Sequence, residues 1–174
     1  MSNVRIVCTD TTSSLAEEIS GVLGVPLSKV DISTTEVNES RLQVKENMRG
    51  RDVFLVQSNG SPVNNNTIEL FLILTALRRA SARRVFAIIP YFAYARQTKK
   101  TSSRVPISAA DFSKLLEEGA MVDHVVTVDI FREQIGGFFS ARCCLDNLTY
   151  TPVAARYFWD KGIKSPVIVC PNAR

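Results

Sequence analysis

The fold of this chain is decided by the sequence VFAIIPYFAYARQTKK, residues Val85–Lys100. The first part, Val85–Pro90, is a continuous apolar run ending in proline, which is typical of a strand buried on both faces of a parallel sheet. The second part, Tyr91–Lys100, carries three cations and a glutamine, which indicate a loop facing an anionic ligand. Because open α/β sheets bind ligands at the carboxyl ends of their strands, we expect the functional site in this loop.

Strand-like and helix-like segments alternate outward from this stretch. Five strands are expected, at Val4–Cys8, Val53–Gln57, Val85–Ile89, Val125–Asp129 and Pro166–Cys170. Helices are expected between them, at Leu15–Leu23, Thr67–Ala80, Ser108–Glu118 and Thr151–Lys161. Strands joined by helices of this length pair in parallel through right-handed crossovers. The sequence therefore predicts a doubly wound α/β fold with a mainly parallel sheet of about five strands.

Shorter signals place the remaining segments. Ser108 is expected to cap the third helix, and the alternation at Leu42–Lys45 suits a small exposed strand pair or flap. A polar loop is expected at Ser58–Asn66, and a turn leading into the last helix at Leu145–Leu148. Internal repeats and linker-like tracts are absent from the sequence, so one domain spanning residues 1–174 is expected.

Composition excludes several classes of protein. A content of 45% hydrophobic and 22% charged residues is ordinary for a globular domain. The net charge of +4 suits an anionic ligand such as phosphate or a nucleotide, but this surplus does not require nucleic acid, which is not the expected partner. The N-terminus leads directly into a strand-like segment and apolar runs are short. We therefore expect no signal peptide, no membrane span and a cytoplasmic location.

The cysteine and histidine content argues against a dedicated metal centre. The four cysteines include the adjacent pair Cys143 and Cys144 but no CxxC pair, and the chain has a single histidine, His124. Reduced thiols are the expected state.

Three clusters are candidates for binding or chemistry. The loop Arg96–Arg104 holds four cations that suit phosphate, or it is a solvated basic loop beside core aromatics. Met48–Asp52 either contacts phosphate or makes a turn. Asp129, at the carboxyl end of a strand, is placed to hold a metal-bound phosphate or a sugar hydroxyl, or it caps the following turn. The glycines at 136 and 137 miss the spacing of a dinucleotide fingerprint.

Six stretches of this sequence match motifs of one known family, in the same order and with nearly the same spacing. They are Asn47–Val53, Ile89–Gln97, Ser103–Ala109, Asp123–Asp129, Gln134–Phe139 and Asp146–Leu148. They resemble the N-terminal domain of ribose-phosphate pyrophosphokinase, also called phosphoribosyl pyrophosphate synthetase. The resemblance covers the whole chain. It implies a transferase of nucleotide biosynthesis that moves a pyrophosphoryl group from ATP to ribose 5-phosphate with Mg²⁺, built from two similar α/β domains and assembled into dimers and hexamers.

The resemblance also implies roles for particular residues. Those implied to bind nucleotide are Arg96, Gln97, Lys99, Lys100 and, on a flap reaching from a neighbouring subunit, Glu39. Those implied to lie near a regulatory phosphate or ADP site are Arg49, Gln134, Asp146 and Asn147. Asp129 is implied as a metal-associated residue, and no residue is assigned a catalytic role.

The chain departs from the family at several of these positions. The family flap begins with an aromatic residue that stacks on adenine, whereas this flap reads Thr35–Glu39, and loss of one base stack costs about 1–3 kcal/mol. Thr98 and Thr101 replace two acids, and Phe131 replaces a histidine associated with Mg²⁺. At Cys170–Arg174 the family continues into a second, ribose-phosphate-binding domain, which is absent from this sequence.

These departures favour a catalytically incomplete family member, acting as a regulatory or structural partner of active synthetase subunits in a homo- or hetero-oligomer. Two alternatives stay open. The chain is part of an active synthetase, or it is a stand-alone module that binds phosphate or a nucleotide. The expectation that the chain binds ATP and Mg²⁺ rests on the family resemblance alone.

Overall fold

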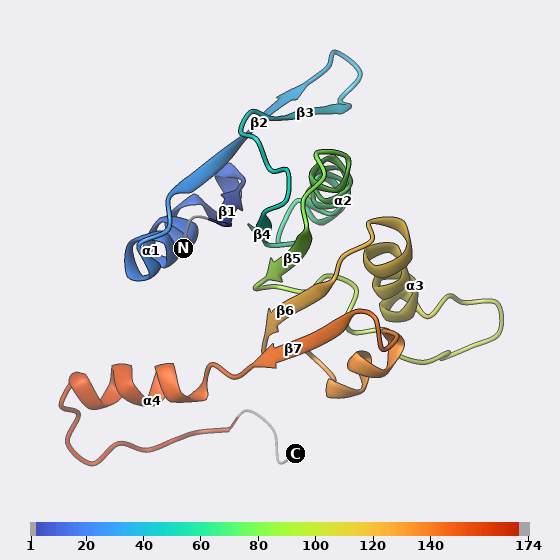
Figure 1. The fold of residues 1–174 in the computed structure, drawn as a ribbon. Coiled ribbons are helices and arrows are strands. Elements are labelled where there is room, and N and C mark those ends of the chain that lie inside the picture. The colour runs from blue at the N-terminus through green and yellow to red at the C-terminus, as the bar shows by residue number, and fades with distance from the viewer. Residues whose placement is uncertain (1–2, 171–174) are drawn as a thin grey trace.

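A computed structural model describes residues 3–170, so most of the stretch Cys170–Arg174, where the family continues into a second domain, lies outside the described residues. Its centre is a seven-stranded sheet with strand order β3-β2-β1-β4-β5-β6-β7 (Figure 1). Every neighbouring pair is parallel except β2 and β3, which are antiparallel. The strands are β1 (Val4–Cys8), β2 (Leu27–Thr34), β3 (Ser40–Val44), β4 (Asp52–Val56), β5 (Arg84–Ile89), β6 (His124–Val128) and β7 (Cys144–Leu148).

Helices join most of the parallel strands. The α-helices are α1 (Ser13–Leu23), α2 (Val63–Arg79), α3 (Ser108–Lys114) and α4 (Thr151–Asp160). A π-helical turn, η2 (Leu115–Gly119), continues α3, and short 3₁₀ helices form η1 (Asp10–Thr12) and η3 (Glu133–Phe138). Residues 3–170 include no helix that is both long enough and apolar enough to cross a membrane.

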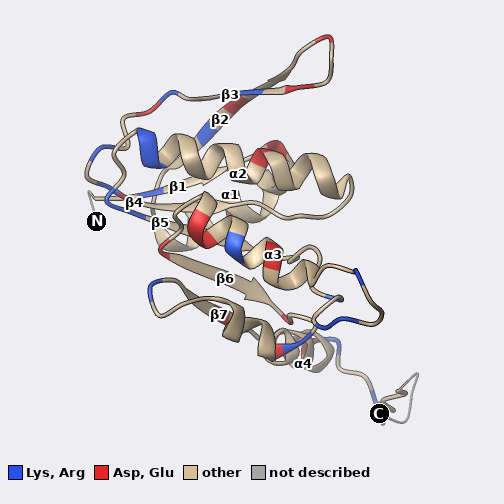
Figure 2. Cartoon of the chain, turned by 90° about the vertical axis from the view of Figure 1, so that its right-hand side faces the viewer, with Lys and Arg blue, Asp and Glu red and all other residues tan. Residues whose placement is uncertain are grey.

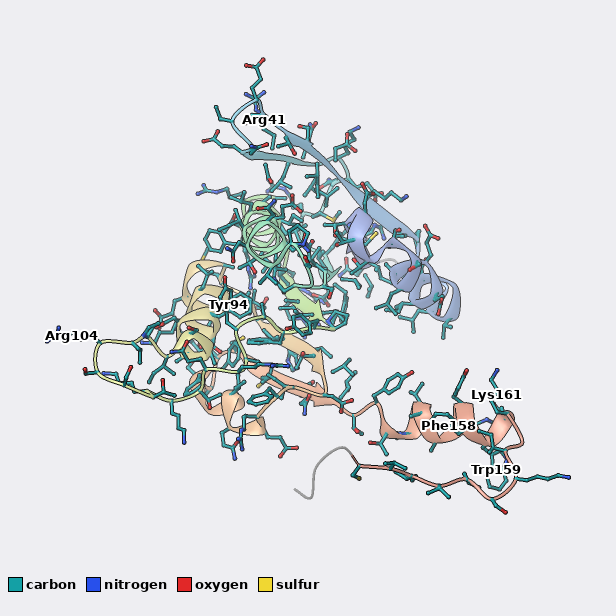
Figure 3. All side chains as sticks on the ribbon, turned by 180° about the vertical axis from the view of Figure 1, so that it is seen from behind. Arg41, Tyr94, Arg104, Phe158, Trp159 and Lys161 are labelled. Atoms are coloured by element: carbon teal, nitrogen blue, oxygen red, sulfur yellow. The ribbon has the colours of Figure 1, made fainter. Side chains whose placement is uncertain are left out.

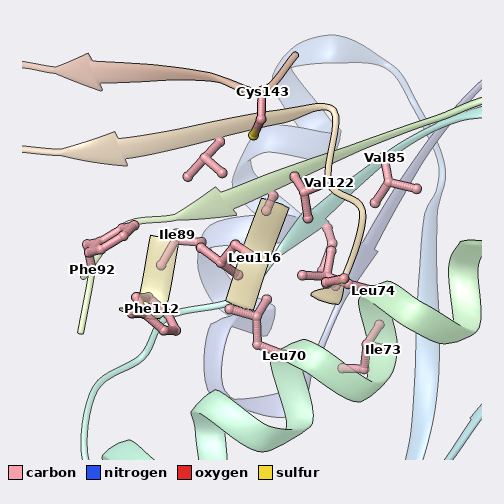
Figure 4. Packing of buried hydrophobic residues seen from close by; sticks show 14 of the residues in the cluster. Leu70, Ile73, Leu74, Val85, Ile89, Phe92, Phe112, Leu116, Val122 and Cys143 are labelled. Carbon is pink, nitrogen blue, oxygen red and sulfur yellow. The ribbon is translucent and has the colours of Figure 1, made fainter. Parts of the chain in front are cut away.

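The main core lies between one face of the sheet and α2 with α3. Alternate strand residues point to this face, and α2 meets them with a stripe of fully buried side chains that includes Leu70, Ile73 and Leu74 (Figure 4). Phe112 of α3 closes the end of the core near the carboxyl edge, where its ring meets Phe92 edge-on at 4.9 Å. This packing fixes the loop that follows β5.

The opposite face is covered only in part. Ala16 of α1 packs with Ile6, Cys8 and Val56 in a second, smaller core. Farther along the sheet, Phe54 and Phe86 stack with ring centroids 4.3 Å apart and remain half-buried.

The fold agrees with the predicted α/β class, but the sheet has seven strands rather than about five. The first four expected strands are confirmed as β1, β4, β5 and β6, and the expected exposed pair is the hairpin of β2 and β3. The predicted turn at Leu145–Leu148 is wrong, because these residues belong to β7, which pairs in parallel with β6. Asp146 and Asn147 disfavour a strand by propensity, but an edge position next to a formed strand overrides that preference.

The fifth expected strand, Pro166–Cys170, is also wrong: this segment has no strand geometry. Its valines and isoleucine are exposed, with Ile168 at 91%, and no described strand lies beside it to supply hydrogen bonds. An apolar run predicts burial, but a strand needs a partner that the run itself does not specify.

Helix boundaries differ from the predictions for local reasons. The α2 helix begins at Val63 rather than Thr67, because Pro62 precedes it with a compatible φ of −76° and the Asn66 N–H already donates to the Pro62 carbonyl at 3.1 Å. Ser108 is the first residue of α3 and not its cap, which is Ile107. The α4 helix is confirmed, but it projects from the sheet and none of its residues is buried (Figures 1 and 3).

The four cysteines carry free thiols, as expected. Burial raises the pKa of the Cys143 thiol to about 12, so this group is an unreactive part of the core.

Candidate functional site

A cavity of about 460 Å³ lies at the carboxyl ends of β5 and β6. It is formed by the loop after β5, the loop after β6 and the first residue of α3. Its lining residues are Tyr91, Phe92, Tyr94, Ala95, Arg96, Gln97, Ser108, Val128, Asp129, Ile130 and Phe131. The cavity therefore occupies the sheet edge where the sequence places the site, and it includes Arg96, Gln97 and Asp129 from the predicted set.

The aromatic residues of the loop are mainly structural. Phe92 is buried against Phe112, and Tyr94, at a φ of +58°, donates its hydroxyl hydrogen to Asn64 Oδ1 at the start of α2 (Figure 3). Tyr91, with 55% of its surface exposed, lies on the rim of the cavity. The contacts of Phe92 with Phe112 and of Tyr94 with Asn64 hold this part of the loop in place. They therefore limit the movement of Arg96, which follows two residues after Tyr94.

Gln97 fixes the loop to the start of α3. Its amide nitrogen donates to the Pro106 carbonyl at 2.8 Å, and its amide oxygen accepts from the Ser108 hydroxyl at 2.9 Å. The Gln97 carbonyl also accepts the Ala109 N–H at 3.2 Å. The amide nitrogen and the amide oxygen of Gln97 are thus both hydrogen-bonded within the protein. In this structure Gln97 lines the cavity, but its side chain serves to position the loop.

Arg96 and Phe131 face each other across the cavity mouth. The guanidinium carbon of Arg96 lies over the Phe131 ring, 5.9 Å from its centroid, and that of Arg132 lies 5.4 Å from the same centroid. Cation–π attraction of this kind holds a guanidinium in place without occupying its N–H donors. The sequence contained these residues, but it gave no signal that the two arginines share one ring.

Asp129 links the cavity to the last helix. It has a φ of +44°, donates its backbone N–H to the Leu148 carbonyl at 2.8 Å, and accepts the Tyr150 N–H at Oδ2 at 3.2 Å. The carboxylate therefore caps the junction between β7 and α4 while it lines the cavity. Across residues 3–170 no group of three or more His, Cys, Asp or Glu side chains is arranged to hold a metal ion.

Other residues of the predicted nucleotide set lie apart from the cavity. Lys99 and Lys100 are exposed on the same loop but do not line it, and the tip of this loop carries Arg104 far from the sheet (Figure 3). Glu39 ends the tight turn of the hairpin between β2 and β3, where its N–H donates to Thr35 Oγ1 at 3.0 Å. This hairpin forms the opposite edge of the sheet from β6 and β7.

The predicted regulatory residues fall into two places. Arg49 lies on the loop before β4, whereas Gln134 belongs to η3 and Asp146 and Asn147 to β7, three strands away in the sheet. Asn147 Oδ1 accepts the Ile130 N–H at 2.9 Å. Asp146 pairs with His124 Nε2 at 2.6 Å, a contact that sequence reasoning missed because it depends on the register between β6 and β7.

Arginines gather at the opposite end of the strands, around the C-terminus of α2 and the starts of β4 and β5 (Figure 2). Much of this charge is compensated, since the buried carboxylate of Asp52 accepts from Arg83 Nε at 2.8 Å and from Arg84 Nη2 at 2.6 Å. These hydrogen bonds hold the pKa of the Asp52 carboxyl well below its usual range.

Comparisons with known proteins agree on one family. A family model described as the N-terminal domain of ribose phosphate pyrophosphokinase matches residues 4–119. A ribose-phosphate pyrophosphokinase of Clostridium perfringens is 42% identical over 173 residues, which are 98% of this chain and 53% of that protein. The corresponding protein of Fusobacterium nucleatum is 41% identical over 172 residues, covering 98% of this chain and 54% of that protein.

A solved structure supports the same assignment. The crystal structure of phosphoribosylpyrophosphate synthetase from Mycobacterium smegmatis has a TM-score of 0.84 and 32% identity, and the match covers 91% of this chain and 52% of that one. The chain thus spans about half the length of the curated relatives it matches. The family model, the relatives and the shared fold together show that this chain belongs to the ribose-phosphate pyrophosphokinase family, as its N-terminal domain.

Proposed function

We propose that this domain is the nucleotide-binding half of a ribose-phosphate pyrophosphokinase and is catalytically incomplete as the present chain. The cavity beside Arg96 is the observation that carries the proposal. It lies where an open α/β sheet binds ligands, and it presents one guanidinium group toward an anion. Lys99 and Lys100 add positive charge along the approach to it.

Incompleteness follows from what phosphoryl transfer requires. Such reactions depend on several cations or metal ions fixed around the phosphates, because catalysis comes from positioning and from electrostatic stabilisation. Arg96 is the single cation among the lining residues, and Gln97 uses its amide to hold the loop. Phe131 cannot bind a metal, and one carboxylate, Asp129, remains. The cavity fits a phosphate-bearing ligand better than it fits Mg²⁺.

Exposed apolar surface supports a partner role. On α4, Trp159 is 82% exposed and Phe158 is 56% exposed, and the segment after this helix exposes Val167–Val169 (Figure 3). Apolar surface of this extent marks an interface with further polypeptide. We propose that synthetase subunits, identical or different, supply that polypeptide, and that the chain acts on them as a regulatory or structural partner. We propose that a second subunit brings Arg49 and the β7 residues of the regulatory set together, since β4 and β7 lie three strands apart within one chain.

The first experiment measures formation of phosphoribosyl pyrophosphate from ATP and ribose 5-phosphate by the purified chain. No turnover is expected, and turnover at the rate of a full-length synthetase would contradict catalytic incompleteness. The same assay is repeated after mixing with a full-length synthetase subunit, whose rate the chain is expected to change.

The second experiment tests association directly. Mass measurement of the chain mixed with a full-length synthetase is expected to give a mixed assembly. A Trp159→Ser variant should associate more weakly, with Lys161→Ala, at the residue that caps the end of the same helix, as the control. A chain that stays separate from the synthetase in this mixture would rule out the partner role and leave the alternative of a stand-alone nucleotide-binding module.

A further inference from the structure

Two guanidinium groups share Phe131, an aromatic ring of the cavity lining: Arg96 lines the cavity, whereas Arg132 lies just outside the lining residues. The guanidinium carbons of Arg96 and Arg132 lie 5.9 Å and 5.4 Å from the centroid of Phe131, whose side chain is half exposed. Cation–π contacts orient the guanidinium planes but leave their N–H groups available. Two guanidinium groups on one ring beside the cavity offer N–H donors to the oxygens of a phosphate chain, which arginine binds in bidentate fashion.

The same opening is poorly suited to a divalent cation. Asp129 supplies the only carboxylate among the lining residues, and its Oδ2 already accepts the Tyr150 N–H. Mg²⁺ takes oxygen ligands in a strict octahedral geometry, and the Phe131 side chain offers no oxygen or nitrogen. Two neighbouring guanidinium charges also oppose the approach of a cation.

We propose that this cavity binds a nucleoside di- or triphosphate as the free anion, with Arg96 and Arg132 neutralising the phosphates in place of Mg²⁺. The inference rests on the proposed function, since it assumes that the cavity takes a nucleotide. Mg²⁺ then competes with the two arginines for the same phosphate oxygens. The structure thus assigns Phe131 as the residue that decides metal dependence: it positions the arginines and does not touch a metal.

The test is calorimetric titration of the full chain with ADP, once in EDTA and once in excess MgCl₂ at equal ionic strength. Binding in EDTA is expected to be about threefold or more tighter, because Mg²⁺ removes negative charge from the ligand. If ADP binds more tightly in MgCl₂ than in EDTA, or equally tightly in both, the inference of metal-free binding is overturned. In either case the proposal that the cavity binds a nucleotide still stands. Absence of binding in both conditions removes the proposed nucleotide function itself.

Two variants separate the roles of the residues. Arg132→Ala is expected to weaken ADP binding in EDTA about tenfold, which equals about 1.4 kcal/mol, whereas Arg104→Ala on the exposed loop is expected to leave it unchanged. Phe131→His is expected to lose the preference for EDTA, since imidazole does not hold the two arginines in the same way and can ligate a metal. Equal effects of Arg132→Ala and Arg104→Ala, or a Phe131→His variant with unchanged preference, would contradict the assignment. Circular dichroism of each variant checks its fold.

Discussion

At the residue scale, the positive charge of Arg96 is what the cavity offers to an anion. Arg96 is the only lining residue that carries a positive charge, and Phe131 holds its guanidinium group toward the opening. The neighbouring Gln97 is bound at both ends and cannot compensate for a lost cation.

We therefore expect Arg96→Ala to weaken nucleotide binding by tenfold or more, since a charge-assisted hydrogen bond contributes about 1.5–3 kcal/mol. Arg104→Ala removes the same charge from the same loop outside the cavity and is the matched control. Titration of both variants with ADP measures the difference. If Arg96→Ala binds as tightly as Arg104→Ala, the loop is not the site.

A second residue-scale prediction concerns pH. Arg83 and then Arg84 lower the pKa of the Asp52 carboxyl through hydrogen bonds, against an opposing effect of burial. Because the folded-state pKa lies below the unfolded value of about 3.9, the stabilisation is complete above that value and is lost as the pH falls through the folded-state pKa. Urea unfolding at several pH values below 5 should show the free energy of unfolding falling with pH, and falling less in Asp52→Asn.

At neutral pH, Asp52→Asn is expected to lower the free energy of unfolding by about 1–2 kcal/mol, because it removes a buried acceptor from two exposed arginines. Asp160→Asn breaks an exposed pair with Arg156 on α4 and should change stability by less than about 0.5 kcal/mol. Matching pH profiles for the two variants would show that the Asp52 cluster contributes nothing specific.

At the element scale, α2 is the helix on which the main core depends. Its buried stripe packs against β4 and β5, and its first turn holds Tyr94 through Asn64. Leu70→Ala is expected to lower the free energy of unfolding by about 2–5 kcal/mol, because it leaves a cavity at a fully buried position. Ile68→Ala, at a site that is 53% exposed on the same helix, should change it by less than about 0.5 kcal/mol.

Urea unfolding of the two α2 variants gives this comparison directly. Similar losses in both would mean that helix propensity, rather than the packing of Leu70, sets the contribution of this helix.

The element scale also shows where sequence prediction succeeds and fails. Strands β1, β4, β5 and β6 were predictable because each is a short run rich in apolar and β-branched residues, although in β5 and β6 full burial falls on alternate residues. The polar edge strand β7 could not be predicted from the sequence, since its stability comes from hydrogen bonds to β6. Pro166–Cys170 shows the reverse error, an apolar run without a neighbouring strand.

At the scale of the whole molecule, the region after β7 stands apart from the rest. The α4 helix buries none of its residues, and Asp129 holds its junction through the Tyr150 N–H. Truncation after Tyr150 is therefore expected to leave the unfolding transition cooperative and to change the free energy of unfolding by less than about 0.5 kcal/mol.

Chemical unfolding of the truncated and full chains tests this expectation. The truncated chain should also lose association with a synthetase subunit, because it lacks the apolar surface around Trp159. A truncated chain that no longer folds would mean that α4 stabilises the sheet by contacts beyond the Asp129 junction.

By itself the sequence determined the alternation of strands and helices as far as β6, the edge of the sheet at which the cavity lies and the cationic loop at Arg96, because these depend on local patterns of burial and charge. Only the tertiary structure decided how those residues are used. In the tertiary structure Gln97 is hydrogen-bonded to Ser108, and Arg96 and Arg132 both form cation–π contacts with Phe131. Arg49 lies three strands away from the residues of β7. Such pairings depend on strand register and loop path, which bring together residues far apart in the chain and leave no periodic trace in the sequence.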